Sequence, residues 1–472
     1  MTTVNKSRAC RSFRRCELTR RSAIQLGTLA IPGAMGFSPL NAEFQQAGPR
    51  HPRARSVILV NLFGGPPHVD LFDMKPDAPT NIRGEFQPIS SSVPGIQISE
   101  LLPLTAQLMD RATLIRSYSH RYNSHNPYNV LTGFDLGVDA ENYYAKRTDH
   151  PSIGAVCHWI DPGPPDVPSH VVLPAFPGYS QALRRAGPYG GYLGTAYDPL
   201  MSSCNPTFAR TSKGDYDAVP AQGFPILPAL EELPDLDSGR FEKRVALLTA
   251  MNRHLEAAER RGALSRFDDD SRRALALLTS GRTRDAFDLS SESEQTRRLY
   301  GEGLWTSSAL VARRLVEAGS RFVTVNWEAK NGNHWDLHEN NFGMLRVQAP
   351  ILDRLIYALI TDLETRGLLN ETLVVVMGEM GRSPRVNAAA GRDHWPQCGF
   401  SLLFGGGTQR GVVVGRSDDQ GAWPDDRPVS AGDMVATIYH LLGVDSGLTV
   451  PDLSGRPMHI SHGGAPVFEA IA

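Results

Sequence analysis

The 472-residue sequence contains few cysteines, and none of them stands in a metal-binding or redox pair. The five cysteines are widely spaced, and no Cys-x-x-Cys is present; they are Cys10, Cys16, Cys157, Cys204 and Cys398. This composition excludes a disulfide scaffold, a zinc finger and a thioredoxin-like function. The 44 glycines and 34 prolines follow no fixed period, which excludes a collagen-like or coiled-coil chain.

An excess of positive charge is also missing. The formal net charge is −2, with 21% charged residues, which argues against a general nucleic-acid binder. The hydrophobic share of 41% is ordinary for a globular protein and excludes disorder of the whole chain. The length predicts two or three domains, or one large α/β domain with insertions.

The first 42 residues differ in character from the rest of the sequence. Seven cations and one acid, Glu17, precede an uncharged and mostly apolar stretch, which is typical of an export signal. Residues 19–24, Thr-Arg-Arg-Ser-Ala-Ile, resemble a twin-arginine signal. We therefore expect export to the periplasm or beyond, with a basic anchor that stays attached as the alternative.

Removal of this segment changes the charge of the protein. Residues 1–42 carry a net charge of +6, so the remainder carries −8. The apolar stretch is short and interrupted by glycine and proline, so we expect no stable membrane span after cleavage.

Residues 43–472 show alternating strand and helix patterns. Apolar, β-rich runs predict strands at 56–63, 112–116, 321–327, 372–377, 401–404 and 411–415. Helical spacing occurs at 101–111, 303–318, 348–366 and 433–442. Alternation of this kind predicts an α/β fold with a mostly parallel sheet and helices on both faces. We also expect a loop-rich excursion at 161–230 and a helical insertion at 238–320.

Polar clusters follow the predicted strands. They contain His68, Asp70 and Asp73; His120 to Asn126; Asn333 to His338; Glu379 and Arg382; and Arg392 to Trp395. Because the carboxyl ends of parallel strands meet at one edge of a sheet, these groups should lie close together. Imidazole and carboxylate groups together favour a divalent ion such as Zn²⁺, Mn²⁺ or Ca²⁺.

Each of these residues also has a purely structural interpretation. Glu379 at a buried strand end needs a cation or a hydrogen-bond network, and Arg382 could be its partner. Asp70 and Asp73 could form turns, and His394 could cap the core. The coincidence of several clusters at strand ends is what favours a metal site.

Six motifs together resemble the DUF1501 family, exported proteins abundant in planctomycete-type bacteria and related to the alkaline phosphatase/sulfatase superfamily. The resemblance runs from about Ser56 to the C-terminus. The motifs are Gly64 to Pro76, Leu131-Thr-Gly133, Gly194 to Pro199, Trp335-Asp-Leu-His338, Gly378 to Pro384 and Gly391 to Trp395.

The resemblance implies a metal site. Asp336, His338 and His394 would be ligands of one ion, and Glu379 stands where the superfamily has the Asp of an Asp-His-Gly motif. Met380, in the position of that His, cannot bind the ion. The first strand ends in Leu62-Phe63, where sulfatases have Asp-Asp, so Asp70, Asp73 or His68 could reach in instead. These departures favour one ion over two.

The resemblance also implies a nucleophile and substrate contacts. Ser124 is the only hydroxyl close to the nucleophile position, and no cysteine lies there, so a formylglycine sulfatase is not expected. Arg382 or Arg392 could hold an anionic group. The substrate-binding candidates are His125, Asn126, Trp335 and Trp395.

The leading hypothesis is an exported, metal-dependent hydrolase of a phosphate or sulfate ester, acting on a small molecule or a polysaccharide. The alternative is a non-catalytic binding or surface-organising protein that keeps the superfamily fold. A third interpretation is a structural fold whose histidines are merely hydrogen-bonded.

Overall fold

The computed structural model describes residues 52–123, 125–135, 144–227 and 281–472. The predicted signal at residues 1–42 lies outside these ranges, and so does most of the predicted helical insertion. Export therefore stays a prediction. Everything below concerns the described residues of the unit 49–472.

The core of this unit is an eight-stranded sheet in the order β14-β4-β13-β10-β1-β9-β5-β6. Every neighbouring pair is parallel except the two pairs made by β13, which runs antiparallel to β10 and to β4. The predicted mostly parallel α/β fold is confirmed. The strands are β1 (Ser56–Asn61), β4 (Ala112–Tyr118), β5 (His170–Leu173), β6 (Leu200–Met201), β9 (Phe322–Asn326), β10 (Thr372–Met377), β13 (Gly399–Phe404) and β14 (Val412–Val414).

The central strands are buried on both faces, as their continuous Val, Ile and Leu runs predict. In β1, Ile58 and Val60 belong to one core cluster, and Val57 and Leu59 belong to a second cluster on the other face. Leu59 lies opposite Val375 of β10 in the parallel register.

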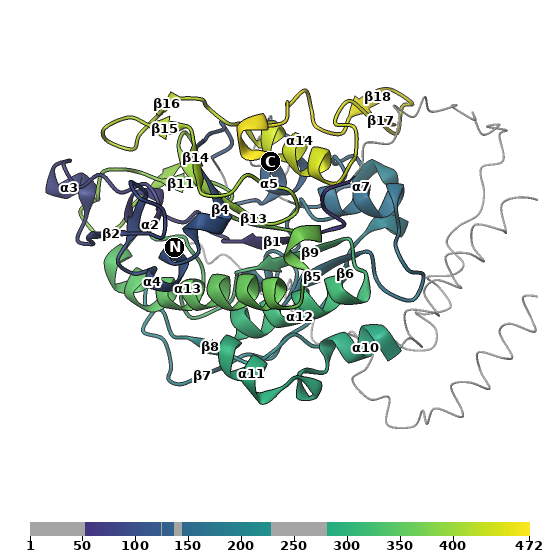
Figure 1. Cartoon of the computed structure of the whole chain (residues 1–472), viewed down its shortest axis with the longest axis horizontal. Coiled ribbons are helices and arrows are strands. Elements are labelled where there is room, and N and C mark those ends of the chain that lie inside the picture. Colours follow the sequence, from purple (N-terminus) through teal and green to yellow (C-terminus); the bar gives the residue numbers. More distant parts are fainter. Residues whose placement is uncertain (1–51, 124, 136–143, 228–280) are drawn as a thin grey trace, which may run out of the picture. The chain divides into compact units, whose positions relative to one another are not determined.

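Helices cover both faces, as predicted. Figure 1 shows α12 (Leu304–Ala318) and α13 (Asn341–Thr365) on one side of the sheet. On the other side lie α5 (Tyr128–Thr132), α7 (Ile153–Ile160) and α14 (Ala431–Leu441). Their buried residues complete the two clusters, so each helical layer packs on one face of the sheet.

Two helices differ from the sequence prediction. α13 begins at Asn341 rather than 348, and Pro350, a residue type that usually marks a first turn, lies inside it. The helix expected at 101–111 is instead α4 (Pro103–Ala106) followed by the 3₁₀ turn η1 (Met109–Arg111). The α4 turn is fixed by tertiary contacts, because the carboxylate of Asp353 in α13 accepts hydrogen bonds from the backbone of Leu104 and Thr105.

The excursion at 161–230 carries regular structure that the sequence analysis did not identify. It supplies β5 and β6 to the edge of the main sheet. In the described part of 238–320, α12 packs on β1 and β9 and is therefore part of the core.

The remaining elements are short. They are α2 (His68–Leu71), α3 (Thr80–Arg83), β2 (Pro88–Ser90), β3 (Gln97–Ser99), η2 (Tyr179–Gln181), η3 (Gly191–Leu193), η4 (Thr195–Tyr197), β7 (Thr207–Phe208), β8 (Ala221–Gln222), α10 (Gly281–Phe287), η5 (Leu289–Ser291), α11 (Glu294–Tyr300), η6 (Leu369–Glu371), β11 (Gly381–Arg382), β12 (His394–Trp395), β15 (Arg416–Ser417), β16 (Pro424–Asp426), β17 (Thr449–Pro451), β18 (Pro457–His459) and η7 (Phe468–Ala470). Among the described residues, no helix has both the length and the apolarity that crossing a membrane requires.

Three histidines, one buried and two half-buried, make this fold sensitive to acid. Burial lowers the pKa of His150 to about 4, and it lowers the pKa values of His170 and His462 to about 3. The rings of His150 and His462 also contact each other, with centroids 4.4 Å apart. All three are therefore neutral in the folded protein at neutral pH.

We predict that the free energy of unfolding falls as the pH drops from about 6.5 towards 4, because the unfolded chain binds protons there and these histidines do not. Each site can contribute up to about 2 kcal/mol at pH 5. Chemical denaturation at pH 7 and pH 5 measures the effect, and His462→Gln should flatten it. An equal slope in that variant would contradict the assignment.

Candidate metal centre

Four side chains from three segments of the chain form a compact group. The possible ligand atoms of His125, Asp336, His338 and His394 all lie within 4.8 Å of one another. Asp336 and His338 follow β9, His125 follows β4, and His394 lies in β12. Their side chains are 18–33% exposed, so a small molecule can reach them.

Three imidazole nitrogens converge on one carboxylate oxygen. From Oδ1 of Asp336, the Nε2 atoms lie at 3.0 Å for His125, 3.1 Å for His338 and 3.6 Å for His394. Three imidazoles and a carboxylate are a donor set that suits zinc and other divalent transition metals. We call these four residues the metal group.

Two of the three imidazoles are oriented by a second carboxylate. Nδ1 of His125 lies 3.0 Å from Oε1 of Glu379, and Nδ1 of His338 lies 2.9 Å from Oδ1 of Asp393. A carboxylate can only accept, so each Nδ1 donates its proton. This leaves the lone pair on Nε2, facing Asp336, and it is the carboxylate–histidine arrangement that commonly supports a bound metal.

The unpaired nitrogens of the group agree with this interpretation. The buried Nε2 atoms of His125 and His394 make no hydrogen bond within the described part of the chain. Nε2 of His125 is close to Asp336 but is not aligned as a hydrogen-bond donor. Buried nitrogens without a partner are rare unless a ligand or water binds them, so the residues present fit a divalent ion.

The electrostatics of the group favour a cation. Burial alone would raise the pKa of Asp336, but its contacts with His125, His338 and His394 hold that pKa far below its usual range. Burial opposes the charge of His125, yet the Asp336 and Glu379 carboxylates raise its pKa. Contact with Asp336 also raises the pKa of His338, whereas burial lowers that of His394. A proton or a metal ion can therefore supply the positive charge that this site attracts.

A tight glycine turn brings the end of β1 against the metal group. Gly64 has a φ of +110°, and a Cβ at this position would lie 2.2 Å from the backbone nitrogen of Asp336. The backbone nitrogen of Gly64 also donates to Oε1 of Glu379, at 2.7 Å. Only glycine fits this close approach.

The buried side chain of Arg382 links Asp336 of the metal group to the surrounding backbone. Its guanidinium is fully buried and donates to the carbonyls of Gly64, Gly65 and Arg392 and to Oδ1 of Asp336. The distance to Asp336 is 2.5 Å. The sequence analysis assigned this side chain to an anionic substrate group, whereas in the structure its donors are engaged by the protein.

Arg392 and Asp70 are engaged with each other rather than with the metal group. Nε and Nη2 of Arg392 each lie 2.7 Å from a carboxylate oxygen of Asp70, and Nδ2 of Asn341 donates to the same carboxylate at 2.8 Å. Both ionic side chains are fully buried. The structure therefore does not bring Asp70 to the metal group.

The predicted substrate contacts are also placed differently. Trp335 is fully buried against Trp327, with ring centroids 5.4 Å apart, and Trp395 is half-buried and donates to the carbonyl of Ala422 at 2.6 Å. Asn126 is buried, and His125 lies in the metal group instead of a substrate pocket. Ser124 lies outside the described residues, so its role as nucleophile stays a prediction.

Sequence reasoning missed one polar residue of this site, Asp393, which orients His338. The available signal was its place directly before His394 in a single motif. The sequence analysis included it in the cluster Arg392 to Trp395 but gave it no role, because its contact with His338, 55 residues away, is not a local signal.

A family model described as "Protein of unknown function (DUF1501)" matches residues 54–471. This chain belongs to the DUF1501 family. The family predicted from the motifs is therefore confirmed. No protein in the curated comparison matches this DUF1501 chain.

Several solved structures share part of the arrangement with this DUF1501 chain. A sulfatase from Pseudoalteromonas is 10% identical, with a TM-score of 0.37, and the match covers 83% of this chain and 68% of that chain. A phosphonate monoester hydrolase from Silicibacter pomeroyi is 12% identical, with a TM-score of 0.34, and the match covers 88% of this chain and 78% of that chain. A lipoteichoic acid synthase from Listeria monocytogenes is 9% identical, with a TM-score of 0.32, and the match covers 83% of this chain and 73% of that chain. With TM-scores below 0.5, this likeness says nothing about the reaction of the DUF1501 chain.

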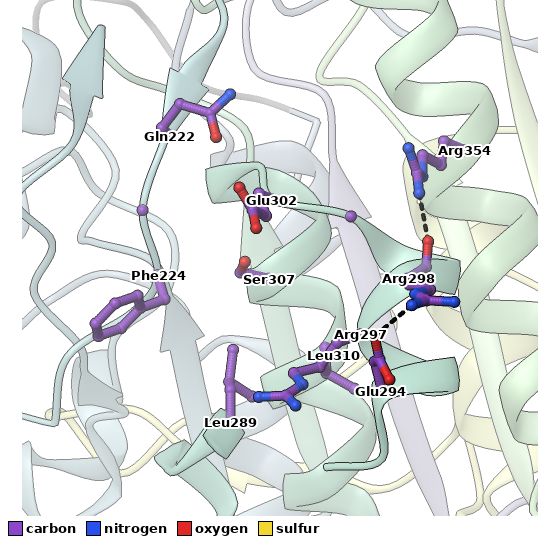
Figure 2. Close-up of a pocket in the computed structure, with 12 residues that line it drawn as sticks. Gln222, Phe224, Leu289, Glu294, Arg297, Arg298, Glu302, Ser307, Leu310 and Arg354 are labelled. Carbon is purple, nitrogen blue, oxygen red and sulfur yellow. Dashed lines mark hydrogen bonds and ion pairs between the residues drawn. The ribbon is translucent and has the colours of Figure 1, made fainter. Parts of the chain in front are cut away.

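A cavity of about 760 Å³ lies apart from the metal group, beside β8, α11 and α12 (Figure 2). Two of the arginines in its lining have partners in the protein. Arg354 donates to the backbone carbonyl of Arg298, and Arg298 forms an ion pair with Glu294. None of the metal-group residues lines this cavity.

We predict that Asp393→Asn weakens metal binding about 10- to 100-fold, because the orienting partner of His338 loses its charge. The fold should persist, since Asp393 is exposed. The matched control is Asp425→Asn, which removes an exposed carboxylate paired with Arg416, at 2.5 Å. Titration of the metal-free protein with Zn²⁺ measures both variants, and wild-type affinity in Asp393→Asn would contradict the orienting role.

We predict that Asp70→Asn lowers the free energy of unfolding by about 3–5 kcal/mol, because it leaves the buried Arg392 charge without its partner. The folded variant should retain the wild-type metal content. Denaturation curves and elemental analysis of the same sample test this. Loss of metal at unchanged stability would instead make Asp70 a ligand.

Proposed function

We propose that this DUF1501 protein is an exported, metal-dependent hydrolase of phosphate or sulfate esters. The observation that carries the proposal is the convergence of three Nε2 atoms on Asp336, with two of the rings held by second carboxylates. Such orientation prepares a site for an ion.

The metal group would hold the ion, and its neighbours would fix the geometry. A bound divalent ion supplies Lewis acidity towards an ester oxygen and lowers the pKa of bound water. Glu379 and Asp393 keep the Nδ1 protons of His125 and His338 in place. Arg382 holds Asp336 against the Gly64–Gly65 turn. Ser124, next to His125 in the sequence, is the predicted nucleophile.

A second candidate is a metal-dependent binding protein without catalysis. It is favoured by the engagement of Arg382 and Arg392, the two cations expected to bind an anionic group, with internal partners. The predicted charge of −8 after removal of the signal also opposes the capture of a polyanion. Both candidates need the metal group, and they differ in whether bond cleavage follows binding.

Metal content and hydrolysis, measured together, test the proposal. We expect wild-type protein to bind about one equivalent of Zn²⁺ or Mn²⁺, and we expect Asp336→Ala and His394→Ala to lose it, because each removes a ligand. His459→Ala, which removes an exposed histidine outside the group, is the control.

The loaded protein is then assayed with p-nitrophenyl phosphate and p-nitrophenyl sulfate. Hydrolysis that is lost in His394→Ala and in Ser124→Ala supports the hydrolase. A loaded wild type that cleaves neither ester favours the binding protein. A wild type that takes up no ion rules out both candidates.

A further inference from the structure

The segment that carries Asp336 and His338 also carries a histidine outside the metal group. His334, Asp336 and His338 are half-buried, whereas Trp335 and Leu337 between them are fully buried. This alternation indicates that His334 lies on the same open side of the segment as the two metal-group residues, while Trp335 and Leu337 face the core. His334 is nevertheless not one of the four possible ligands.

One hydrogen bond fixes which ring nitrogen of His334 carries the proton. The backbone nitrogen of Asp336 donates to Nδ1 of His334, at 3.2 Å. Because Nδ1 accepts this bond, the ring is neutral and carries its proton on Nε2. A protonated Nε2 has no free lone pair, so it cannot bind a metal ion. It can only donate, and its ligand must therefore be a hydrogen-bond acceptor.

The proton on Nε2 of His334 is available to such a ligand. The contact with Asp336 is the one hydrogen bond of the His334 ring within the described residues, and it engages Nδ1. Nε2 is not among the fully buried polar atoms without a partner, so solvent and ligands can reach it. The ring therefore presents a free N–H donor directly beside the residue on which the three metal-group histidines converge.

Contacts on the outer side hold the His334 ring in place. Tyr216 packs edge-on against it, with centroids 6.4 Å apart. The segment of Tyr216 is itself fixed, because the backbone nitrogen of Val219 donates to the carbonyl of Asn331 at 3.2 Å. Nδ2 of Asn333 also donates to the carbonyl of Val219, at 2.7 Å. A donor held in this way loses little conformational entropy when it binds a ligand.

His334 offers what the two buried arginines do not. Arg382 and Arg392, which the sequence analysis assigned to an anionic group, donate to internal partners. A phosphate or sulfate ester has unesterified oxygens that accept hydrogen bonds, and hydrogen bonds to such charged oxygens are the strong ones. The N–H of His334 is a donor of the required kind on the open side of the metal group.

We propose that His334 is a specificity-determining residue that recognises the anionic group of the ester. Its Nε2 proton would be donated to an unesterified oxygen of the phosphate or sulfate group at the metal group. Tyr216 is a positioning residue, which keeps the imidazole ring in this orientation. The inference rests on the proposed function, and it concerns the recognition of the anion rather than the cleavage of the ester.

Isothermal titration of the Zn²⁺-loaded full chain with inorganic phosphate and inorganic sulfate tests the role of His334. His334→Asn keeps an acceptor in the place of Nδ1, so the bond from Asp336 persists while the Nε2 donor is lost. We expect the wild type to bind at least one of the two oxyanions, and His334→Asn to bind it about 10- to 100-fold more weakly, because a hydrogen bond to a charged group is lost. His459→Asn, which changes an exposed histidine elsewhere, is the control and should bind like the wild type.

Two variants of Tyr216 test its positioning role. Tyr216→Ala should weaken oxyanion binding about three- to tenfold, because the His334 ring is then free to move. Tyr216→Phe keeps the ring and should restore wild-type affinity. Equal loss in both variants would contradict a role that depends on the ring alone.

Zn²⁺ content, measured on the same samples, separates this proposal from the proposed function. His334→Asn should retain the wild-type content, because His334 is not a ligand. Unchanged oxyanion affinity in a Zn²⁺-loaded His334→Asn would overturn the role of His334 and leave the proposed function intact. A loaded wild type that binds neither oxyanion would also overturn it, and loss of Zn²⁺ in His334→Asn would make His334 part of the metal site. A wild type that takes up no Zn²⁺ would reject the proposed function itself.

Discussion

The loops at the carboxyl end of the central strands are held together by contacts to one carboxylate oxygen, Oδ1 of Asp336. Three imidazole nitrogens and one guanidinium nitrogen approach it from four different segments. The Gly64 turn makes room for the Asp336 backbone, and the buried Arg382 ties that turn to the carboxylate. Any change that displaces Asp336 therefore disturbs β1, β9 and the β11–β12 hairpin together.

The carboxylates around the metal group have two different roles. Asp70 and Arg392 neutralise each other and fix the loop before His394, at a distance from the metal group. Glu379 and Asp393 instead face histidine rings, where a carboxylate sets which nitrogen carries the proton. This division explains why carboxylates that look alike in the sequence have different roles. It also concentrates the metal-binding chemistry on one compact group.

Most of the main strands, the mostly parallel character of the sheet and three of the four metal-group residues could be predicted from the sequence, because apolar runs and the polar residues after them are local signals. Contacts between side chains that are far apart in the sequence could not be predicted in this way. Arg382 and Arg392 donate to backbone carbonyls and to the side chains of Asp336 and Asp70, which are 46 and 322 residues away in the sequence, so both arginines looked free to bind an anion. His125 and its Glu379 partner are 254 residues apart. Strand β5 was missed because four residues among prolines and glycines give too short a pattern.

X-ray absorption spectroscopy of the Zn²⁺-loaded protein tests the central claim most directly. The account predicts a first shell with three imidazole nitrogens at about 2.0–2.1 Å and at least one oxygen, as expected from the metal group. In His394→Ala the imidazole contribution should fall to two rings or the ion should be lost. A first shell of oxygens alone, or one unchanged in His394→Ala, would contradict the claim that Asp336 and the three histidines form a metal centre.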